Sequence, residues 1–136
     1  MNFALWVAQA LLAVVFLASG AVKSVGSKEW LLASGQTGLS AYSVPFIRFI
    51  AVCEILGAAG LIAPWATGIM PILTPLAAAC LTVIMVGAAN AHTKLARAHA
   101  SDPPRRRKEL LNVSTNAVLL AGCLFVVVGR AFRGSV

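Results

Sequence analysis

Four long apolar runs constrain the fold of this chain more than any other feature. They lie at about residues 3–23, 44–64, 70–92 and 110–130. Each is about 20 residues long, the length at which a helix spans a hydrocarbon core of about 30 Å. Backbone polar groups inside lipid must be satisfied within the segment, which favours helices. We therefore predict an all-α integral membrane protein, a single domain over residues 1–136 that forms an antiparallel four-helix bundle.

The composition argues against an ordinary soluble domain. Only 11% of the residues are charged and 60% are hydrophobic, whereas soluble domains are about 25% charged. A secretory signal peptide carries Lys or Arg ahead of its apolar segment, and the first run has none. We therefore expect the first run to be a membrane helix of the protein.

Positive charge is distributed unevenly between the two predicted membrane faces. The net charge is +7, with eleven Lys and Arg residues. Most of them fall in the first and third connections: Lys23, Lys28, Lys94, Arg97, Arg105, Arg106, Arg107 and Lys108. Cytoplasmic loops of membrane proteins are enriched in Lys and Arg, so we predict that both connections are cytoplasmic and both termini outside. The basic run 105–108 should contact anionic membrane lipids. No aromatic residues alternate with these charges, which argues against nucleic-acid binding.

The cysteines give no sign of a metal or redox site. Cys53, Cys80 and Cys123 each fall within a predicted helix and show no Cys-x-x-Cys spacing. We interpret them as small buried apolar residues, and we predict no metal site.

Polar residues within the runs repeat with helical spacing, so each helix should carry one polar stripe that faces the interior of the bundle. Most of these residues lie in the cytoplasmic half of the predicted helices, and the outer half holds little besides Gln9. The residues that we take as candidates for a site are Ser19, Lys23, Arg48, Glu54, His92, Asn112 and Asn116.

Glu54 is the most costly of these residues to place in lipid. A lone charge at the centre of a membrane helix costs about 2.5–3.5 kcal/mol. Side chains lean toward the N-terminus of their helix, so Lys23 and Glu54, on antiparallel helices, should lean toward each other. We expect the two to pair, and the sequence leaves open whether they form an ion pair or Glu54 is protonated. We expect Asn116 to pack against Glu54 or Lys23.

Such a cluster has a structural and a functional interpretation. Hydrogen bonds between membrane helices contribute only about 0.6 kcal/mol of stability on average, which is less than the cost of burying a carboxylate. We therefore favour a functional site, with Glu54 and Lys23 as candidate catalytic residues and the others as candidate ligand-binding residues. For His92 we favour a structural role, because a histidine at the end of a membrane helix needs no special function.

Several segments resemble one protein family. Residues 16–23, 48–64 and 68–92, together with Asn116 and 128–130, resemble the DoxX-like family of small bacterial membrane proteins. The resemblance implies a four-helix protein of the bacterial plasma (inner) membrane. Some members of the family are associated with thiosulfate:quinone oxidoreductase, and others with membrane complexes that handle oxidative stress.

The first function that we expect is an accessory or anchoring subunit of a membrane redox system, with a pocket for a quinone-like lipophile around Glu54. No other cofactor is evident, and a partner protein would carry the electrons. One alternative is a cofactor-free membrane enzyme, an isomerase or an epoxide-opening enzyme, in which Glu54 is the acid or base. A second alternative is a small transporter. The small residues Cys53, Gly57 and Gly60 permit close packing, either within the bundle or in a homo-oligomer.

Overall fold

A computed structural model describes residues 2–132 of the chain, which are helical apart from short connections. The elements are α1 (Asn2–Val25), α2 (Lys28–Ala33), the 3₁₀ helix η1 (Thr37–Leu39), α3 (Val44–Thr67), α4 (Leu73–Ala98) and α5 (Pro103–Ala131). Four of these helices, α1, α3, α4 and α5, are long and apolar enough to cross a membrane. The prediction of an all-α protein with four such helices is confirmed.

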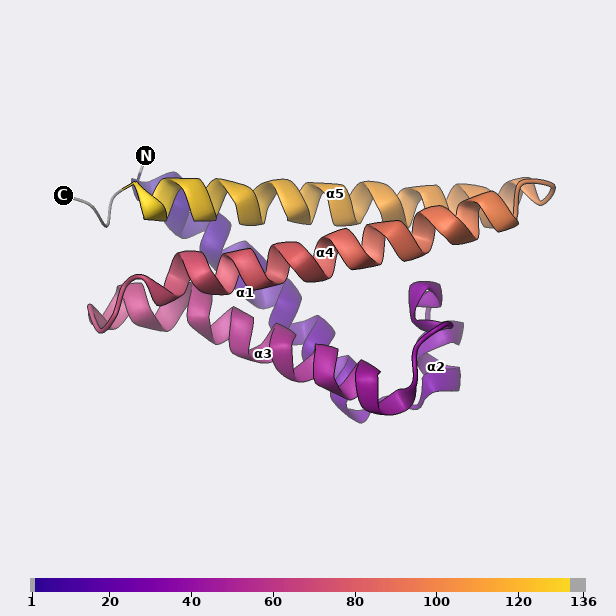
Figure 1. The fold of residues 1–136 in the computed structure, drawn as a ribbon, viewed down its shortest axis with the longest axis horizontal. Coiled ribbons are helices and arrows are strands. Elements are labelled where there is room, and N and C mark those ends of the chain that lie inside the picture. Colours follow the sequence, from indigo (N-terminus) through magenta and orange to yellow (C-terminus); the bar gives the residue numbers. More distant parts are fainter. Residues whose placement is uncertain (1, 133–136) are drawn as a thin grey trace.

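The long helices are arranged as two pairs, as Figure 1 shows. α1 packs against α3, α4 packs against α5, and α3 joins the pairs by packing against α4. The start of α1, the end of α5 and the α3–α4 turn lie at one end of the molecule. The pairs diverge toward the other end, where α2 lies (Figure 1). We call this the basic end, because it holds Lys23, Lys28 and the run 105–108.

α4 and α5 extend further at the basic end than the hydropathy predicted. α4 continues to Ala98 and α5 already begins at Pro103, so only a short turn joins them. Asp102 caps α5 through its Oδ1, which accepts a hydrogen bond from the backbone N–H of Arg105 at 3.3 Å. Pro103 suits the first helical position, where a backbone N–H would have no intrahelical partner. As a result Glu109, expected in a loop, lies on a helix.

α3 also passes beyond its predicted end. Pro64 lies inside the helix, which continues to Thr67. The hydroxyl of Thr67 donates to the backbone oxygen of Ala63 at 2.8 Å, which satisfies a carbonyl near the end of the helix. Gly68 ends the helix with φ of +72°, a left-handed conformation that glycine adopts without a steric penalty.

The connection between α1 and α3 contains the short helix α2, followed by η1. Ser27 caps α2, since its hydroxyl accepts from the backbone N–H of Trp30 at 3.2 Å. Leu31 and Leu39 from this connection pack with Ile47 of α3 in a small apolar cluster. The cluster fixes α2 and η1 against the basic end of the bundle.

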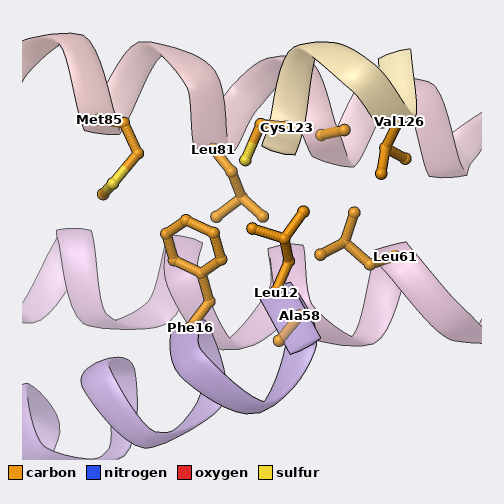
Figure 2. Close-up of a cluster of buried hydrophobic side chains, with 9 residues drawn as sticks. Leu12, Phe16, Ala58, Leu61, Leu81, Met85, Cys123 and Val126 are labelled. Carbon is orange, nitrogen blue, oxygen red and sulfur yellow. The ribbon is translucent and has the colours of Figure 1, made fainter. Parts of the chain in front are cut away.

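The main apolar core lies between the two helix pairs (Figure 2). It contains Leu12, Phe16, Ala58, Leu61, Ala78, Leu81, Met85, Cys123 and Val126. All four long helices contribute side chains to this core. Large apolar side chains are also exposed on the outside of all four long helices, as expected of a surface that contacts lipid.

Small residues bring α3 and α4 together. A Cβ atom on Gly57 would lie 2.7 Å from Cδ2 of Leu81, and one on Gly60 would lie 2.7 Å from Cβ of Ala77. The small-residue surface of α3 is therefore a packing surface within the bundle. Among the cysteines, the interpretation as buried apolar residues holds only for Cys123, because Cys53 is half-buried and Cys80 is exposed.

Candidate functional site

A cavity of about 510 Å³ lies between the diverging helix pairs, and we call it the inner cavity. Phe16 and Met85 form part of its lining and belong to the main core, which closes the cavity toward the middle of the bundle. Gly38, Leu39 and Tyr42 line it from the connection between α1 and α3. Its size and its mostly apolar walls are typical of sites for small lipophilic molecules.

Lys23 and Glu54 meet at the wall of this cavity that α1 and α3 form. The Nζ atom of Lys23 lies 2.8 Å from Oε1 and 2.9 Å from Oε2 of Glu54. It also donates to the hydroxyl of Ser19 at 2.5 Å, so all three ammonium hydrogens have acceptors. Glu54 is 1% exposed. The expected contact between Lys23 and Glu54 is confirmed, and the pair is buried at the cavity wall.

Gly20 explains why α1 and α3 come close enough for this pair. It lies one helical turn before Lys23 on the same face of α1. A Cβ atom on Gly20 would lie 2.8 Å from the backbone oxygen of Ala51 and 2.8 Å from Cγ1 of Ile55. The absence of a side chain therefore allows α1 to rest directly on the backbone of α3 beside the ion pair.

Arg48 was expected to bind a ligand, but it is not among the described residues that line the inner cavity. Its guanidinium donates to the backbone oxygen of Lys23 and, at 3.1 Å, to that of Gly26. The last carbonyls of a helix have no intrahelical donors. Arg48 therefore caps the C-terminal end of α1, which is a structural role.

Asn112 and Asn116 line the inner cavity from α5, on the wall opposite Lys23. The side-chain amide of Asn116 donates to the backbone oxygen of Asn112 at 2.9 Å. The amide of Asn112 reaches the backbone oxygen of Gly35 at 3.5 Å. The expectation that Asn116 packs against Glu54 or Lys23 is wrong, because α5 pairs with α4 and the cavity separates it from α3 at this depth.

His92 also lines the inner cavity, and it contacts a carboxylate that the sequence analysis missed. Its Nδ1 atom lies 2.6 Å from Oε2 of Glu109, and Oε1 of Glu109 accepts from the hydroxyl of Thr37 at 2.7 Å. Glu109 is 4% exposed. Positions 109, 112, 116, 119 and 123 follow helical spacing, so extending the polar stripe of α5 by one step would have identified it.

Glu109 separates the inner cavity from a second cavity that lies closer to the tip of the basic end. We call this second cavity the outer cavity; it is not in the half of the bundle that holds Gln9. The outer cavity has a volume of about 350 Å³. Its lining consists of Leu32, Thr37, Ser40, Leu95, His99, Arg105, Lys108 and Glu109. The contact between His92 and Glu109 thus forms part of the partition between the two cavities.

The opposite end of the bundle is more polar than the sequence suggested. Gln9 donates to the backbone oxygen of Leu61 and accepts from Nε of Arg130 at 2.7 Å. The guanidinium of Arg130, which is 1% exposed, lies 5.1 Å from the ring centroid of Trp6 and 4.4 Å from that of Trp65. The expectation that this half holds little besides Gln9 is therefore wrong. This cluster ties α1, α3 and α5 together where the helix pairs converge.

Within residues 2–132, no three His, Cys, Asp or Glu side chains are grouped in a way that could hold a metal ion. The family model described as the DoxX-like family matches residues 7–126 of the chain. The matched region contains Lys23, Glu54 and the polar residues of the opposite cavity wall. No curated protein sequence and no solved structure matches the chain.

Proposed function

The chain belongs to the DoxX-like family, and from that premise we propose that it binds a lipophilic, oxygen-bearing molecule of the quinone type in the inner cavity. The observation that supports this proposal most directly is the division of the cavity lining. Apolar side chains make up most of the walls, and polar groups lie on two opposite walls. Ser19, Lys23 and Glu54 lie on one wall, and His92 and Asn116 on the other.

A quinone has an apolar ring and tail with a carbonyl oxygen on each of two opposite edges. Both walls carry groups that can donate hydrogen bonds to such oxygens. The hydroxyl of Ser19 accepts from Lys23, and no acceptor for its own hydrogen is present among the described residues. On the other wall, the side-chain amide of Asn116 uses one of its two hydrogens, which leaves the second for a ligand. The arrangement suits a ligand with two oxygens better than a ligand with one polar head.

Access from lipid is consistent with such a ligand. Phe49 and Val83 line the cavity between α3 and α4, and they are 62% and 72% exposed. Val15 and Thr115 line it between α1 and α5 and are also exposed. A lipid-soluble molecule would therefore reach the cavity from the side, between helices, without crossing the aqueous phase.

We also propose the cellular role that the family suggests. In this role the chain is an accessory subunit of a redox system in the bacterial plasma membrane, and a partner protein exchanges electrons with the bound quinone. The basic end then faces the cytoplasm, as the distribution of Lys and Arg favours. The enzymatic alternative, with Glu54 as acid or base, has less support, because both oxygens of Glu54 accept hydrogen bonds from Lys23.

The test is binding of decylubiquinone to the purified protein in detergent, measured by equilibrium dialysis. Gly87 lines the inner cavity, and a Cβ atom there would meet nothing within 4 Å, so Gly87→Leu should fill the cavity without disturbing the helix. Ala121→Leu adds similar bulk to an exposed position of α5 and is the matched control. We expect Gly87→Leu to weaken binding by roughly tenfold or more, because the ligand and the new side chain occupy the same volume. Equal binding by both variants, or no binding by the unaltered protein, would reject the proposal.

A further inference from the structure

We propose that the outer cavity is a binding site for the phosphate group of an anionic phospholipid. Three of its lining residues carry or can carry positive charge: His99, Arg105 and Lys108. Ser40 adds a hydroxyl that can donate, whereas the hydroxyl of Thr37 already donates to Glu109. The cations and the hydroxyl of Ser40 match the oxygens of a phosphate diester.

The two strongest cations of the outer cavity are available to a ligand. Arg105 lies 3.2 Å from Oδ2 of Asp102, but its side chain is 72% exposed and that of Asp102 is 41% exposed. Ion pairs that are this exposed contribute little, so Arg105 can exchange its partner readily. Within the described residues, Nζ of Lys108 has no hydrogen-bond partner, and its side chain lies beside Gly35.

Glu109 is the one acidic residue in the lining, and both of its oxygens already have hydrogen-bonding partners. Its Oε1 accepts from Thr37, and its Oε2 contacts Nδ1 of His92 at 2.6 Å. His99 also lines the outer cavity, and its Nδ1 lies 2.8 Å from the backbone oxygen of Leu95. Arg105 and Lys108 therefore outnumber Glu109 among the charged side chains of the lining.

The position and the apolar part of the lining favour a lipid as the source of the phosphate. The outer cavity lies at the basic end, beyond the most apolar parts of the four membrane helices, which is the level of lipid head groups. Leu32 and Leu95 supply apolar surface for the glycerol and the first acyl carbons. Trp30 of the adjacent α2 is 54% exposed, and tryptophan is enriched at this level of the bilayer.

The basic run itself provides a matched pair of variants for the test. Arg105 and Lys108 line the outer cavity, whereas Arg106 and Arg107 lie between them in the sequence and do not line it within the described part of the chain. The double variants Arg105→Gln/Lys108→Gln and Arg106→Gln/Arg107→Gln remove the same charge from the same helix. Only the first pair alters the proposed site.

The experiment is native mass spectrometry of the detergent-solubilised protein during titration with phosphatidylglycerol, with phosphatidylcholine as the neutral lipid. We expect Arg105→Gln/Lys108→Gln to weaken binding of the first phosphatidylglycerol by about tenfold or more, and the control pair to weaken it far less. The conservative variant Lys108→Arg should retain binding, which separates loss of the site from loss of folding.

Two results would overturn the proposal. Equal weakening by both double variants would mean that the basic run attracts lipid diffusely, without a built site. Displacement of phosphatidylglycerol by millimolar inorganic phosphate would mean that the site takes free phosphate and does not depend on the lipid. Selective retention of phosphatidylglycerol in the presence of inorganic phosphate supports the lipid as the ligand.

Discussion

Removal of the ammonium group of Lys23 tests whether the buried ion pair is a major source of stability. Lys23→Met keeps much of the length and apolar surface of the side chain and leaves Glu54 at 1% exposure without its cation. Both carboxylate oxygens lose a donor, at 2.8 and 2.9 Å, and the hydroxyl of Ser19 loses one as well. Breaking a buried ion pair by removing one partner typically costs about 3–5 kcal/mol.

The loss of stability would be smaller if Lys23 and Glu54 behaved as an ordinary polar contact between membrane helices. Such contacts contribute about 0.6 kcal/mol on average. For Lys23→Met we expect a loss of stability of about 3 kcal/mol, the lower end of the range for a broken buried pair. The two magnitudes differ enough for an unfolding experiment to separate them.

The assay is reversible unfolding in mixed micelles with increasing sodium dodecyl sulfate, followed by circular dichroism. The double variant Lys23→Met/Glu54→Gln should lose less stability than the sum of the two single variants, with a coupling energy of about 2 kcal/mol. Lys94→Met removes the same charge from an exposed position and is the control. A coupling energy at or below about 0.6 kcal/mol would refute the reasoning.

Three further substitutions test packing and the polar cluster around Arg130, and their effects on stability are measured as changes in melting temperature. Gly57→Ala should destabilise the protein by about 1–3 kcal/mol, because its Cβ would lie 2.7 Å from the buried Leu81. Gly87→Ala places its methyl group in open space and should stabilise the helix by about 0.5–1 kcal/mol. Equal changes in melting temperature for Gly57→Ala and Gly87→Ala would contradict the packing described. Arg130→Gln should destabilise by about 3 kcal/mol through lost hydrogen bonds and ring contacts. It should also change the tryptophan emission, and unchanged emission would contradict the contact with Trp65.

The sequence predicted the membrane helices well but not their ends. Hydropathy detects the part of a helix that lies in lipid, whereas the helix itself continues for as long as its backbone hydrogen bonds can form. α4 and α5 therefore extend to Ala98 and from Pro103, past the points where charged residues begin. Glu109 was assigned to a loop for this reason, although its spacing from Asn112 and Asn116 fits the helical stripe.

In the candidate site, the sequence predicted the one contact that follows from the direction of the side chains along their helices. Lys23 and Glu54 lean toward each other from antiparallel helices, and the structure brings them together. Arg48 could not be placed in this way, because its acceptors are backbone carbonyls and every residue has one. Asn116 was misplaced because the sequence does not reveal that the two helix pairs diverge and leave a cavity between them.

The strength of the ion pair is controlled by a position that carries no charge. At Gly20 a single added carbon would meet the backbone oxygen of Ala51 and the side chain of Ile55, both at 2.8 Å. Backbone cannot yield as a flexible side chain can, so the two helices would have to move apart. An ammonium and a carboxylate one turn away would then separate, and water or lipid would enter between them. Alanine at residue 20 should consequently behave like an electrostatic mutation, although it alters neither Lys23 nor Glu54.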